Sequence, residues 1–382
     1  MSTSSPVIGL LCRAKMKKSL LRQKVSFRAR LSYRAGLQTG ATVYFFTAKD
    51  FIKQRNKIKG VYYDKSQKKW RRKLFPFPDI IFRLGGTYTA NKYPSFNRSL
   101  KSHKTIVLNR LKSFDKYTQY KVLRKKSSTA SALPITRELS LSKKQQLFQF
   151  INRHSNVYIK AKYSFQSRGV MRVRKKGTNS FEYLYFYRKR IKRGTVSKTQ
   201  LMKTLTSFFK RKTLFIQKEI PIFTHSGKPF DIRVEMNKTP EGKPKVSAYC
   251  VKEHPKGVFT SKNSNSYKLR NFFRMKYNYS DQYVTSLIKK IDQVCYTTYE
   301  VLESGYGPLG EISVDLGLDK KGELWIIEAN LCSGKRAFYM TYGSANVKRS
   351  YVEMFSYAVK KLNRKEFQHE RGKSNRYYII FG

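Results

Sequence analysis

Residues 311–330 read EISVDLGLDKKGELWIIEAN, and this stretch decides which fold the chain is expected to adopt. Apolar and polar residues alternate on both sides of a turn that contains Gly322, which is the pattern of a β-hairpin. The alternation predicts that three side chains share one face of the first strand: Glu311, Ser313 and Asp315. It also predicts three facing pairs across the hairpin: Asp319 with Leu324, Asp315 with Glu328, and Ser313 with Asn330.

This hairpin carries a large share of the acidic residues. Six of the 23 Asp and Glu residues lie between positions 303 and 328. Two carboxylates that face each other across strands repel each other unless a cation lies between them. Magnesium takes oxygen ligands from one or two carboxylates together with substrate phosphates. We therefore expect a magnesium site formed by Asp315, Glu328 and Asn330. The alternative is a solvated hairpin face whose acids pair with the abundant lysines.

Basic residues on two earlier strands could bind phosphate. Lys160 lies in a strand expected at residues 157–161, beside a loop over residues 162–169. A lysine beside such a loop can hold phosphate oxygens together with backbone N–H groups. In a strand expected at 230–236, Asp231 and Arg233 share one face, and an arginine there can neutralise a transferring phosphoryl group. In so basic a chain, any single Lys or Arg is more often a solvated surface residue. The prediction of a phosphate site therefore depends on Lys160 and Arg233 occurring together.

The first part of the chain alternates strands with helical segments. Strands are expected at 7–11, 42–46 and 79–83, with a basic helix through about residue 35 and a hairpin over residues 60–78. This order predicts a small α/β domain with a parallel sheet. Beyond it we expect a mostly helical stretch over 101–137, a helix capped by Ser142, and a helix capped by Ser197. Two later helices are expected over 280–302 and 350–362.

Composition restricts the class of protein. Hydrophobic residues make up 40% of the 382 residues, which is enough for packed cores and argues against disorder. Eighty-one Lys and Arg against 23 Asp and Glu give a formal charge of +58, which favours a polyanionic partner. Basic clusters occur at residues 15–24, 65–73, 121–126 and 188–193. There is no Cys-x-x-Cys pair and no apolar run long enough to span a membrane, so we expect reduced thiols and a location inside the cell.

The order of these pieces along the chain resembles the ATP-grasp superfamily, and most closely its YheC/YheD-like group of endospore coat-associated proteins. The resemblance covers nearly the whole chain. It implies an α/β (α+β) ATP-grasp fold preceded by a small parallel-sheet domain. The implied units are an amino-terminal domain over residues 1–98, an ATP-grasp domain over 99–365 with two subdomains and a hinge near 217–220, and a basic tail over 366–382.

The same resemblance implies roles for individual residues. The implied ATP contacts are Lys116, Lys160, Ser167, Gly169, Gln217, Lys218, Glu219, Ile220, Asp231 and Lys252. Within this set Lys116 and Lys160 would contact phosphates, Lys218 and Glu219 would form the adenine hinge, and Asp231 would meet the ribose. Arg233 and Lys160 would be the catalytic residues. The implied metal ligands are again Asp315, Glu328 and Asn330, so the implied cofactors are ATP and magnesium.

Three hypotheses for function follow. The first is a carboxylate–amine or carboxylate–thiol ligase that forms an acylphosphate from an acidic small molecule, peptide or polymer. The second is an inactive ATP-grasp scaffold that serves as a basic structural protein and binds spore-coat components; the implied location is the mother-cell cytoplasm or the spore coat. The third and weakest is a nucleic-acid-binding protein, because no known nucleic-acid motif occurs. Ser167 at a family glycine and Lys252 at an expected arginine indicate an altered lid and substrate side.

Overall fold

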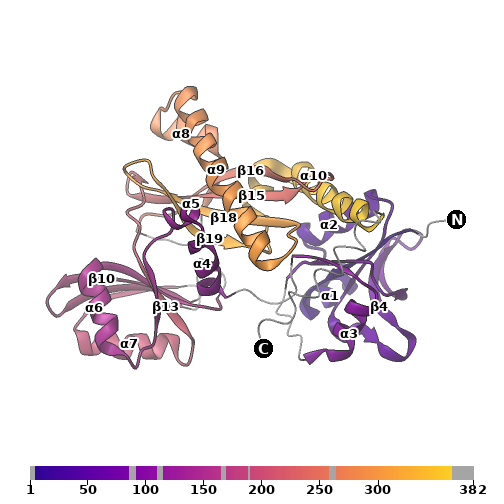
Figure 1. The fold of residues 1–382 in the computed structure, drawn as a ribbon, viewed down its shortest axis with the longest axis horizontal. Coiled ribbons are helices and arrows are strands. Elements are labelled where there is room, and N and C mark those ends of the chain that lie inside the picture. The colour runs from indigo at the N-terminus through magenta and orange to yellow at the C-terminus, as the bar shows by residue number, and fades with distance from the viewer. Residues whose placement is uncertain are drawn as a thin grey trace.

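The structure is a computed structural model, and it describes residues 5–85, 92–109, 115–164, 169–187, 190–257 and 264–363. Three sheets organise these residues around four hydrophobic cores, and one core is shared by the first sheet, α10 and β16 of the third sheet. In Figure 1 the first sheet lies at the right, the second at the lower left, and the third above and between them. The predicted α/β class and the parallel amino-terminal sheet are confirmed.

The first sheet has a parallel centre. Strands β1 (Val7–Leu11), β2 (Thr42–Phe46), β6 (Ile80–Arg83) and β7 (Ile106–Leu108) run parallel in the order β2-β1-β6-β7. The antiparallel strands β3 (Phe51–Ile52), β4 (Lys57–Asp64) and β5 (Lys69–Pro76) extend the β2 edge. The turns η1 (Ala48–Asp50) and η2 (Lys53–Arg55) connect them. Parallel strands place their carboxyl ends at one edge, where ligands of such sheets usually bind.

The helices beside this sheet differ in part from the prediction. The single basic helix expected through residue 35 is two helices, α1 (Ala14–Leu21) and α2 (Phe27–Gln38). Gln23 has a φ of 60°, which ends the first helix, and the Ser26 side chain caps the second by accepting from the Ala29 N–H. Helix α3 (Pro94–Ser102) precedes β7, so the expected helical stretch over 101–137 was wrong at that point. The boundary predicted at residue 98 stays a prediction, although the pairing of β7 with β6 favours placing it after Leu108.

The second sheet is antiparallel. Helices α4 (Lys116–Arg124) and α5 (Ser127–Ala130) lead into β8 (Thr136–Leu139). The sheet order is β12-β11-β10-β9-β13-β8, with β9 (Asn156–Ala161), β10 (Val170–Gly177), β11 (Ser180–Tyr187), β12 (Arg190–Val196) and β13 (Leu214–Lys218). Helices α6 (Lys144–His154) and α7 (Lys198–Phe209) supply buried leucines and phenylalanines to its core. Ser197 caps α7 as predicted, whereas Lys143 and not Ser142 occupies the cap position of α6.

The third sheet bears the acidic hairpin. Its order is β17-β16-β15-β18-β19, and β14 (Thr224–His225) pairs with β15 (Lys228–Lys238). The other strands are β16 (Pro244–Glu253), β17 (Asn265–Lys268), β18 (Glu311–Leu318) and β19 (Leu324–Asn330). Helices α8 (Leu269–Tyr277) and α9 (Asp281–Tyr306) cover one face, on which the alternate apolar residues of β15 and β18 are buried. The opposite face is therefore left for the charged residues.

The hairpin has the predicted register near the acids but not at the turn. Asp315 faces Glu328 and Ser313 faces Asn330, as predicted. A β-bulge next to Asp315 shifts the register by one residue, so Leu318 faces Leu324 and the predicted Asp319–Leu324 pair was wrong. The Asp319 carboxylate instead accepts hydrogen bonds from the N–H groups of residues 321 and 323 and from the Trp325 indole. The bulge thus lets Asp319 accept hydrogen bonds in the turn while Asp315 still faces Glu328.

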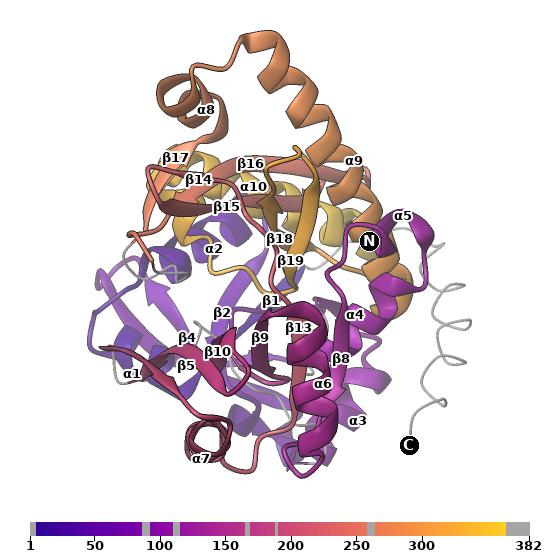
Figure 2. The same cartoon turned by 90° about the vertical axis from the view of Figure 1, so that its left-hand side faces the viewer.

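Helix α10 (Arg336–Asn363) joins the first and third sheets. It starts well before the predicted residue 350 and bends at Gly343, where φ is 78°. Figures 1 and 2 both show it beside α2 and the strands of the third sheet. Its Tyr351 and Phe355 pack against Phe82 of β6. Within the described residues, no helix is both long and apolar enough to cross a membrane.

Candidate active site

The charged face of the third sheet gathers most of the predicted site. Period-two alternation on four adjacent strands directs the polar side chains of each strand to the face opposite α9. The strands in register bring together seven such residues: Asp231, Arg233, Glu235, Lys252, Asp315, Glu328 and Asn330. Six of these seven were predicted as site residues from the sequence, and Glu235 was not.

Arg233 and Asp315 form the centre of this face. The Arg233 guanidinium donates Nε to Asp315 Oδ1 at 2.6 Å and Nη2 to Oδ2 at 2.8 Å, which is a bidentate pair. Its Nη1 donates to the Ser313 hydroxyl at 2.8 Å. Burial opposes the charge on Arg233, but Asp315 outweighs it and raises the arginine's pKa above its usual value. A permanently charged donor is therefore fixed beside the acidic pair.

Lys252 connects Asp315 to a second carboxylate. Its Nζ lies 3.1 Å from Asp315 Oδ1 and 2.6 Å from Asp231 Oδ1. The other oxygen of Asp231 contacts His254 Nε2 at 2.7 Å. Burial opposes ionisation of Asp231, but Lys252 and His254 lower its pKa. Asp231 is thus an ionised carboxylate that already has two partners, which supports a role in positioning Lys252 more than the ribose contact expected from the sequence.

Two lysines from other elements face Glu328. Asp115 caps α4 by accepting from the Tyr117 N–H, which makes Lys116 the first residue of that helix. The Lys116 Nζ lies 3.2 Å from Glu328 Oε2. Lys160 of β9 donates to Gln217 Oε1 at 2.5 Å. Burial, together with the nearby charge of Lys116, lowers the pKa of Lys160 to about 8. Two cations and one carboxylate leave a net positive charge that suits a phosphate chain.

These lysines line a cavity of about 180 Å³ between the second and third sheets. Its lining is mostly apolar and includes Phe215, Ile220, Ile222 and Ile326. The charged residues of the lining are Lys116, Lys160, Lys218 and Glu328. An apolar pocket with a few charged groups can hold a flat ring at one place and an anionic chain at another. The cavity is therefore the candidate nucleotide site.

The predicted hinge borders this cavity. The backbone N–H of Lys218 donates to the residue 135 carbonyl at 2.8 Å, and that of Glu219 donates to the Asn156 carbonyl at 2.9 Å. The Glu219 carboxylate accepts two hydrogen bonds from Arg174, at 2.9 and 3.1 Å. Lys218, Ile220 and Gln217 line the cavity, whereas Glu219 takes part through its backbone and its pair with Arg174. The segment is thus fixed at both ends before any ligand binds.

The predicted lid is described only in part. Ser167 lies outside the described residues. The Gly169 carbonyl accepts from the Ala161 N–H at 2.8 Å, which closes the loop onto β9. A Cβ atom at Gly169 would lie 2.9 Å from Ser164 Cβ and 3.1 Å from Ala161 Cβ. Glycine is therefore required there by close packing.

The oxygen atoms on β18 and β19 decide whether the residues fit magnesium. Glu328 has Lys116 on Oε2, and Asn330 donates its amide N–H to Asp315 at 3.2 Å, which directs its oxygen elsewhere. Asp315 receives N–H groups from Arg233, Lys252 and Asn330 on its two oxygens. The donor set is the oxygen set that magnesium prefers. Asp315, Glu328 and Asn330 supply oxygens of this kind, and Asp315 and Glu328 would each have to release an N–H partner before they could share one ion with Asn330.

Sequence reasoning missed residues that lie on this same face. The alternation placed Ser313 on the face of Asp315 without assigning it a role, and His254, two residues after Lys252, could have been found by the same alternation. Thr136 accepts from Gln217 Nε2 at 2.9 Å and so orients the partner of Lys160. That contact joins residues 81 apart in the chain, and no local pattern predicts it.

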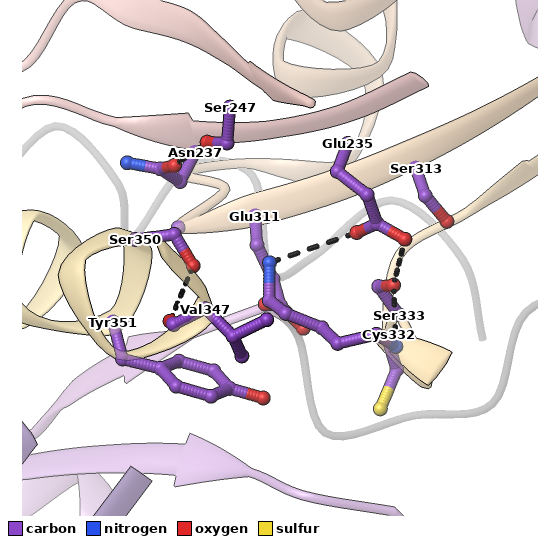
Figure 3. Close-up of polar contacts among 12 residues, drawn as sticks. Glu235, Asn237, Ser247, Glu311, Ser313, Cys332, Ser333, Val347, Ser350 and Tyr351 are labelled. Carbon is purple, nitrogen blue, oxygen red and sulfur yellow. Dashed lines mark hydrogen bonds and ion pairs between the residues drawn. The ribbon is translucent and has the colours of Figure 1, made fainter. Parts of the chain in front are cut away.

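A buried ion cluster extends the site toward the first sheet (Figure 3). Lys335 Nζ lies 3.1 Å from Glu311 Oε2 and 3.6 Å from Glu235 Oε2, and all three side chains are at most 1% exposed. The Ser333 hydroxyl donates to Glu235 Oε1 at 2.7 Å. Glu235 also lies 3.8 Å from Arg233 Nη1, so the cluster is continuous with the charged face.

Comparison with known proteins identifies relatives of the chain. A model of the YheC/D-like ATP-grasp family matches residues 104–360. Two curated relatives come from Bacillus subtilis (strain 168). Endospore coat-associated protein YheD is 24% identical over 316 residues, which are 79% of this chain and 66% of that protein. Endospore coat-associated protein YheC is 23% identical over 324 residues, which are 84% of this chain and 88% of that protein. The chain thus spans slightly less than two thirds of the length of YheD.

Solved structures share the fold. The D-alanine–D-alanine ligase of Bacillus anthracis has a TM-score of 0.55 at 10% identity, with 97% of this chain and 100% of that chain covered. The VanG D-Ala:D-Ser ligase of Enterococcus faecalis has a TM-score of 0.54 at 13% identity, with 94% and 99% covered. At such low identity the likeness concerns the fold alone.

Proposed function

The chain belongs to the YheC/D-like ATP-grasp family, and on that premise we propose that it is a magnesium-dependent ligase that joins a carboxylate to an amine or a thiol through an acylphosphate. One observation carries the proposal. Lys116, Lys160 and Glu328 line one largely apolar cavity, and Asp315, which holds Arg233, faces Glu328 on the adjacent strand. The base would contact the apolar lining, the phosphate chain would contact the two lysines, and the phosphoryl acceptor would lie near Arg233.

The first step would transfer the γ-phosphoryl group of ATP to a carboxylate. A carboxylate oxygen attacks the γ-phosphorus, the bond to the β,γ-bridging oxygen breaks, and ADP leaves with that electron pair. Arg233 and Lys252, both held by Asp315, would stabilise the negative charge on the transferring group. Magnesium, held by Glu328 and Asn330, would supply charge neutralisation between the phosphates.

The second step would consume the acylphosphate. The amine nitrogen attacks the acyl carbon, the carbon–oxygen bond to phosphate breaks, and inorganic phosphate leaves as the amine loses a proton. Lys160 and Lys116 would hold the phosphate chain during the first step and release ADP afterwards. Asp231 would keep Lys252 aimed at the transferring group, since it contacts that ammonium at 2.6 Å.

The setting of the reaction is proposed from the relatives. YheC and YheD are endospore coat-associated proteins. We propose that this chain acts in the mother-cell cytoplasm or on the spore coat, on an acidic substrate that its formal charge of +58 attracts. We also propose that residues 1–98 with β7 form the unit that receives this substrate, and that residues 217–220 are the hinge of the ATP-grasp unit.

A second candidate function is a non-catalytic scaffold. The observation that favours it is that Arg233 and Lys252 already neutralise Asp315, to which Asn330 also donates, so these two cations could take the place of a metal ion. Such a protein would bind acidic coat components through its basic surface and would not turn over ATP.

Trapping of the intermediate separates the two functions. Hydroxylamine attacks acylphosphates and gives hydroxamates, so the protein is incubated with ATP, magnesium, hydroxylamine and a panel of mono-, di- and tricarboxylates and acidic peptides. The ligase predicts equal amounts of ADP and hydroxamate, both abolished by Arg233→Met. Wild-type protein that binds ATP and magnesium but forms neither product would favour the scaffold. Formation of AMP in place of ADP would contradict the acylphosphate route.

A further inference from the structure

Asp315 is held by two cations, and each of them lies near a second carboxylate. Lys252 Nζ lies 3.1 Å from Asp315 Oδ1 and 2.6 Å from Asp231 Oδ1. Arg233 makes two hydrogen bonds to Asp315, and its Nη1 lies 3.8 Å from Glu235 Oε1. Lys252 thus already contacts its second carboxylate, whereas Arg233 would have to move by about 1 Å to form a hydrogen bond with Glu235.

Strand β15 places Glu235 beside Arg233. The two residues are two positions apart on this strand, so their side chains point to the same face of the third sheet. Across the strand pair, Arg233 faces Asp315. The neighbouring pair in the same register is Glu235 with Ser313. The guanidinium of Arg233 therefore has one carboxylate in front of it, on β18, and another beside it on its own strand.

Glu235 has room for a further hydrogen-bond donor. Its side chain is only 1% exposed. Oε1 accepts from the Ser333 hydroxyl at 2.7 Å (Figure 3), and Oε2 lies 3.6 Å from Lys335 Nζ. Among the residues that the structure describes, no donor forms a hydrogen bond with Oε2. A carboxylate offers about four acceptor positions, and a buried one with few donors costs free energy, so a further donor would stabilise it.

A buried cluster holds Glu235 from the segment after β19. Lys335 also lies 3.1 Å from Glu311, which in turn lies 3.5 Å from Arg28 of α2. Positive and negative groups thus alternate from Arg233 to Arg28. Burial raises the pKa of Glu235, and the charges of Lys335 and Arg233 oppose that rise. A closer Arg233 would stabilise the ionised carboxylate further.

A metal ion would compete with Arg233 for the oxygens of Asp315. Asp315 is the third of the predicted metal ligands, and it would have to release an N–H partner to share an ion with Glu328 and Asn330. A largely buried cation that lost its carboxylate would destabilise the site strongly. A second carboxylate beside Arg233 removes most of that cost. It also leaves other N–H groups of the guanidinium, which has five, to face a phosphoryl group.

We propose that Glu235 is a positioning residue for the ligase reaction, and that it takes over Arg233 when Asp315 binds the metal ion. Arg233 then stays beside the transferring phosphoryl group, and Asp315 becomes available as a ligand. Ser333 and Lys335 keep Glu235 in place in both states. The inference deepens the proposed function and rests on it, because the exchange occurs only if a metal ion binds at Asp315.

The test measures how much magnesium tightens the binding of a non-hydrolysable ATP analogue. Calorimetry gives the dissociation constants without and with magnesium, and their ratio is the magnesium gain. Glu235→Gln keeps an acceptor for Ser333 but removes the charge that Arg233 would need. The gain should fall about 10-fold, as expected for the loss of one charge-assisted hydrogen bond. In an Arg233→Met background, Glu235→Gln should change the gain no further.

Glu311→Gln is the matched control, because it removes the other carboxylate beside Lys335 from the same buried cluster. Among the described residues, the ion pairs of Glu311 are with Arg28 and Lys335 and not with Arg233. Glu311→Gln should lower the free energy of unfolding in urea, as Glu235→Gln does, but it should keep the magnesium gain of the wild-type protein. Equal losses of the gain in the two variants would overturn the inference, because the cluster would then act through stability alone.

A second measurement does not depend on the folding of any variant. In a crystal structure of the wild-type protein with the analogue and magnesium, Arg233 should donate to Glu235 and keep at most one hydrogen bond to Asp315. A complex in which Arg233 keeps both overturns the inference, as does a Glu235→Gln variant with the full magnesium gain. Both results leave the proposed function standing. Wild-type protein that does not bind the analogue, or that gains nothing from magnesium, overturns the proposed function, and the inference with it.

Discussion

Arg233 and Asp315 face each other on neighbouring strands and share two hydrogen bonds of 2.6 and 2.8 Å. Both side chains are largely buried, with 18% and 11% of their surface exposed. The pair holds a cation at the centre of the acidic face, where the sequence led us to expect either a metal ion or pairing with lysines at a solvated surface. The proposed role of Arg233 depends on the interaction free energy between these two side chains.

Arg233→Met should destabilise the fold by about 3 kcal/mol, because it leaves a buried carboxylate with fewer partners. Arg233→Met combined with Asp315→Leu should cost less than the sum of the two single changes, by about 1–3 kcal/mol. Urea denaturation of the four proteins measures the coupling. Arg274→Met is the matched control, because its pair with Asp281 is exposed, and it should change stability by less than about 0.5 kcal/mol. Additive effects of the two central changes would show that the pair is not coupled.

ATP binding should take up a proton above pH 8. Burial and the charge of Lys116 lower the pKa of Lys160 to about 8, so Lys160 of the free protein loses its proton as the pH rises through that value. Phosphates favour the charged lysine, so binding raises its pKa and draws a proton from the buffer near pH 9 but not at pH 7. Affinity should fall as the pH rises above 8.

Calorimetry at pH 9 in two buffers of different ionisation enthalpy measures this proton uptake. Lys160→Met should abolish it. Lys162→Met removes a lysine two residues away on the same segment and should leave it intact. Equal apparent enthalpies in the two buffers for the wild-type protein would argue that Lys160 does not meet the phosphates.

Asn109→Ala should destabilise the protein by about 2–4 kcal/mol. The Asn109 side chain accepts from the N–H groups of Gly310 and Glu311 and donates to the carbonyls of Glu311 and Leu331, and the residue is fully buried. Removing it leaves buried backbone groups without partners. Its φ of 58° adds strain for alanine but not for glycine.

Comparison of Asn109→Ala with Asn109→Gly in urea denaturation separates the two causes. Asn109→Gly should be less destabilised than Asn109→Ala by about 1 kcal/mol, the cost of a left-handed backbone for a residue with a Cβ atom. A loss of stability smaller than about 1 kcal/mol in both variants would mean that water replaces the side chain at this junction.

The parts of the structure that follow from local alternation could be predicted from the sequence. The faces of the acidic hairpin, the parallel strand β1 and the hairpin over residues 60–78 all depend on neighbours along one or two strands. The strand register at Asp319 could not be predicted from the sequence. It depends on the bulge, and the bulge depends on whether the Asp319 carboxylate accepts from the turn N–H groups or faces Leu324. The early end of α1 could not be predicted either. It results from the positive φ of Gln23, and glutamine rarely adopts such a backbone conformation.

The sequence predicted residues that gather on the charged face of the third sheet, but it did not predict their partners. Lys116 and Glu328 lie 212 residues apart, and only the packing of α4 against the third sheet brings them within 3.2 Å. The three N–H partners of Asp315 come from three different strands, so no single motif shows that its oxygens are occupied. Alternation with Lys252 could have placed His254 on the charged face, but only the partner strand shows that it contacts Asp231.

The most direct test of the central claim is calorimetry of ATP binding with and without magnesium. Wild-type protein should bind ATP more tightly with magnesium, Glu328→Gln should lose the gain due to magnesium, and Glu323→Gln, the same change at an exposed turn position of the hairpin, should keep it. Binding would also raise the melting temperature in a saturable way. A folded wild-type protein that binds no ATP, or a Glu328→Gln variant with the full effect of magnesium, would contradict the account.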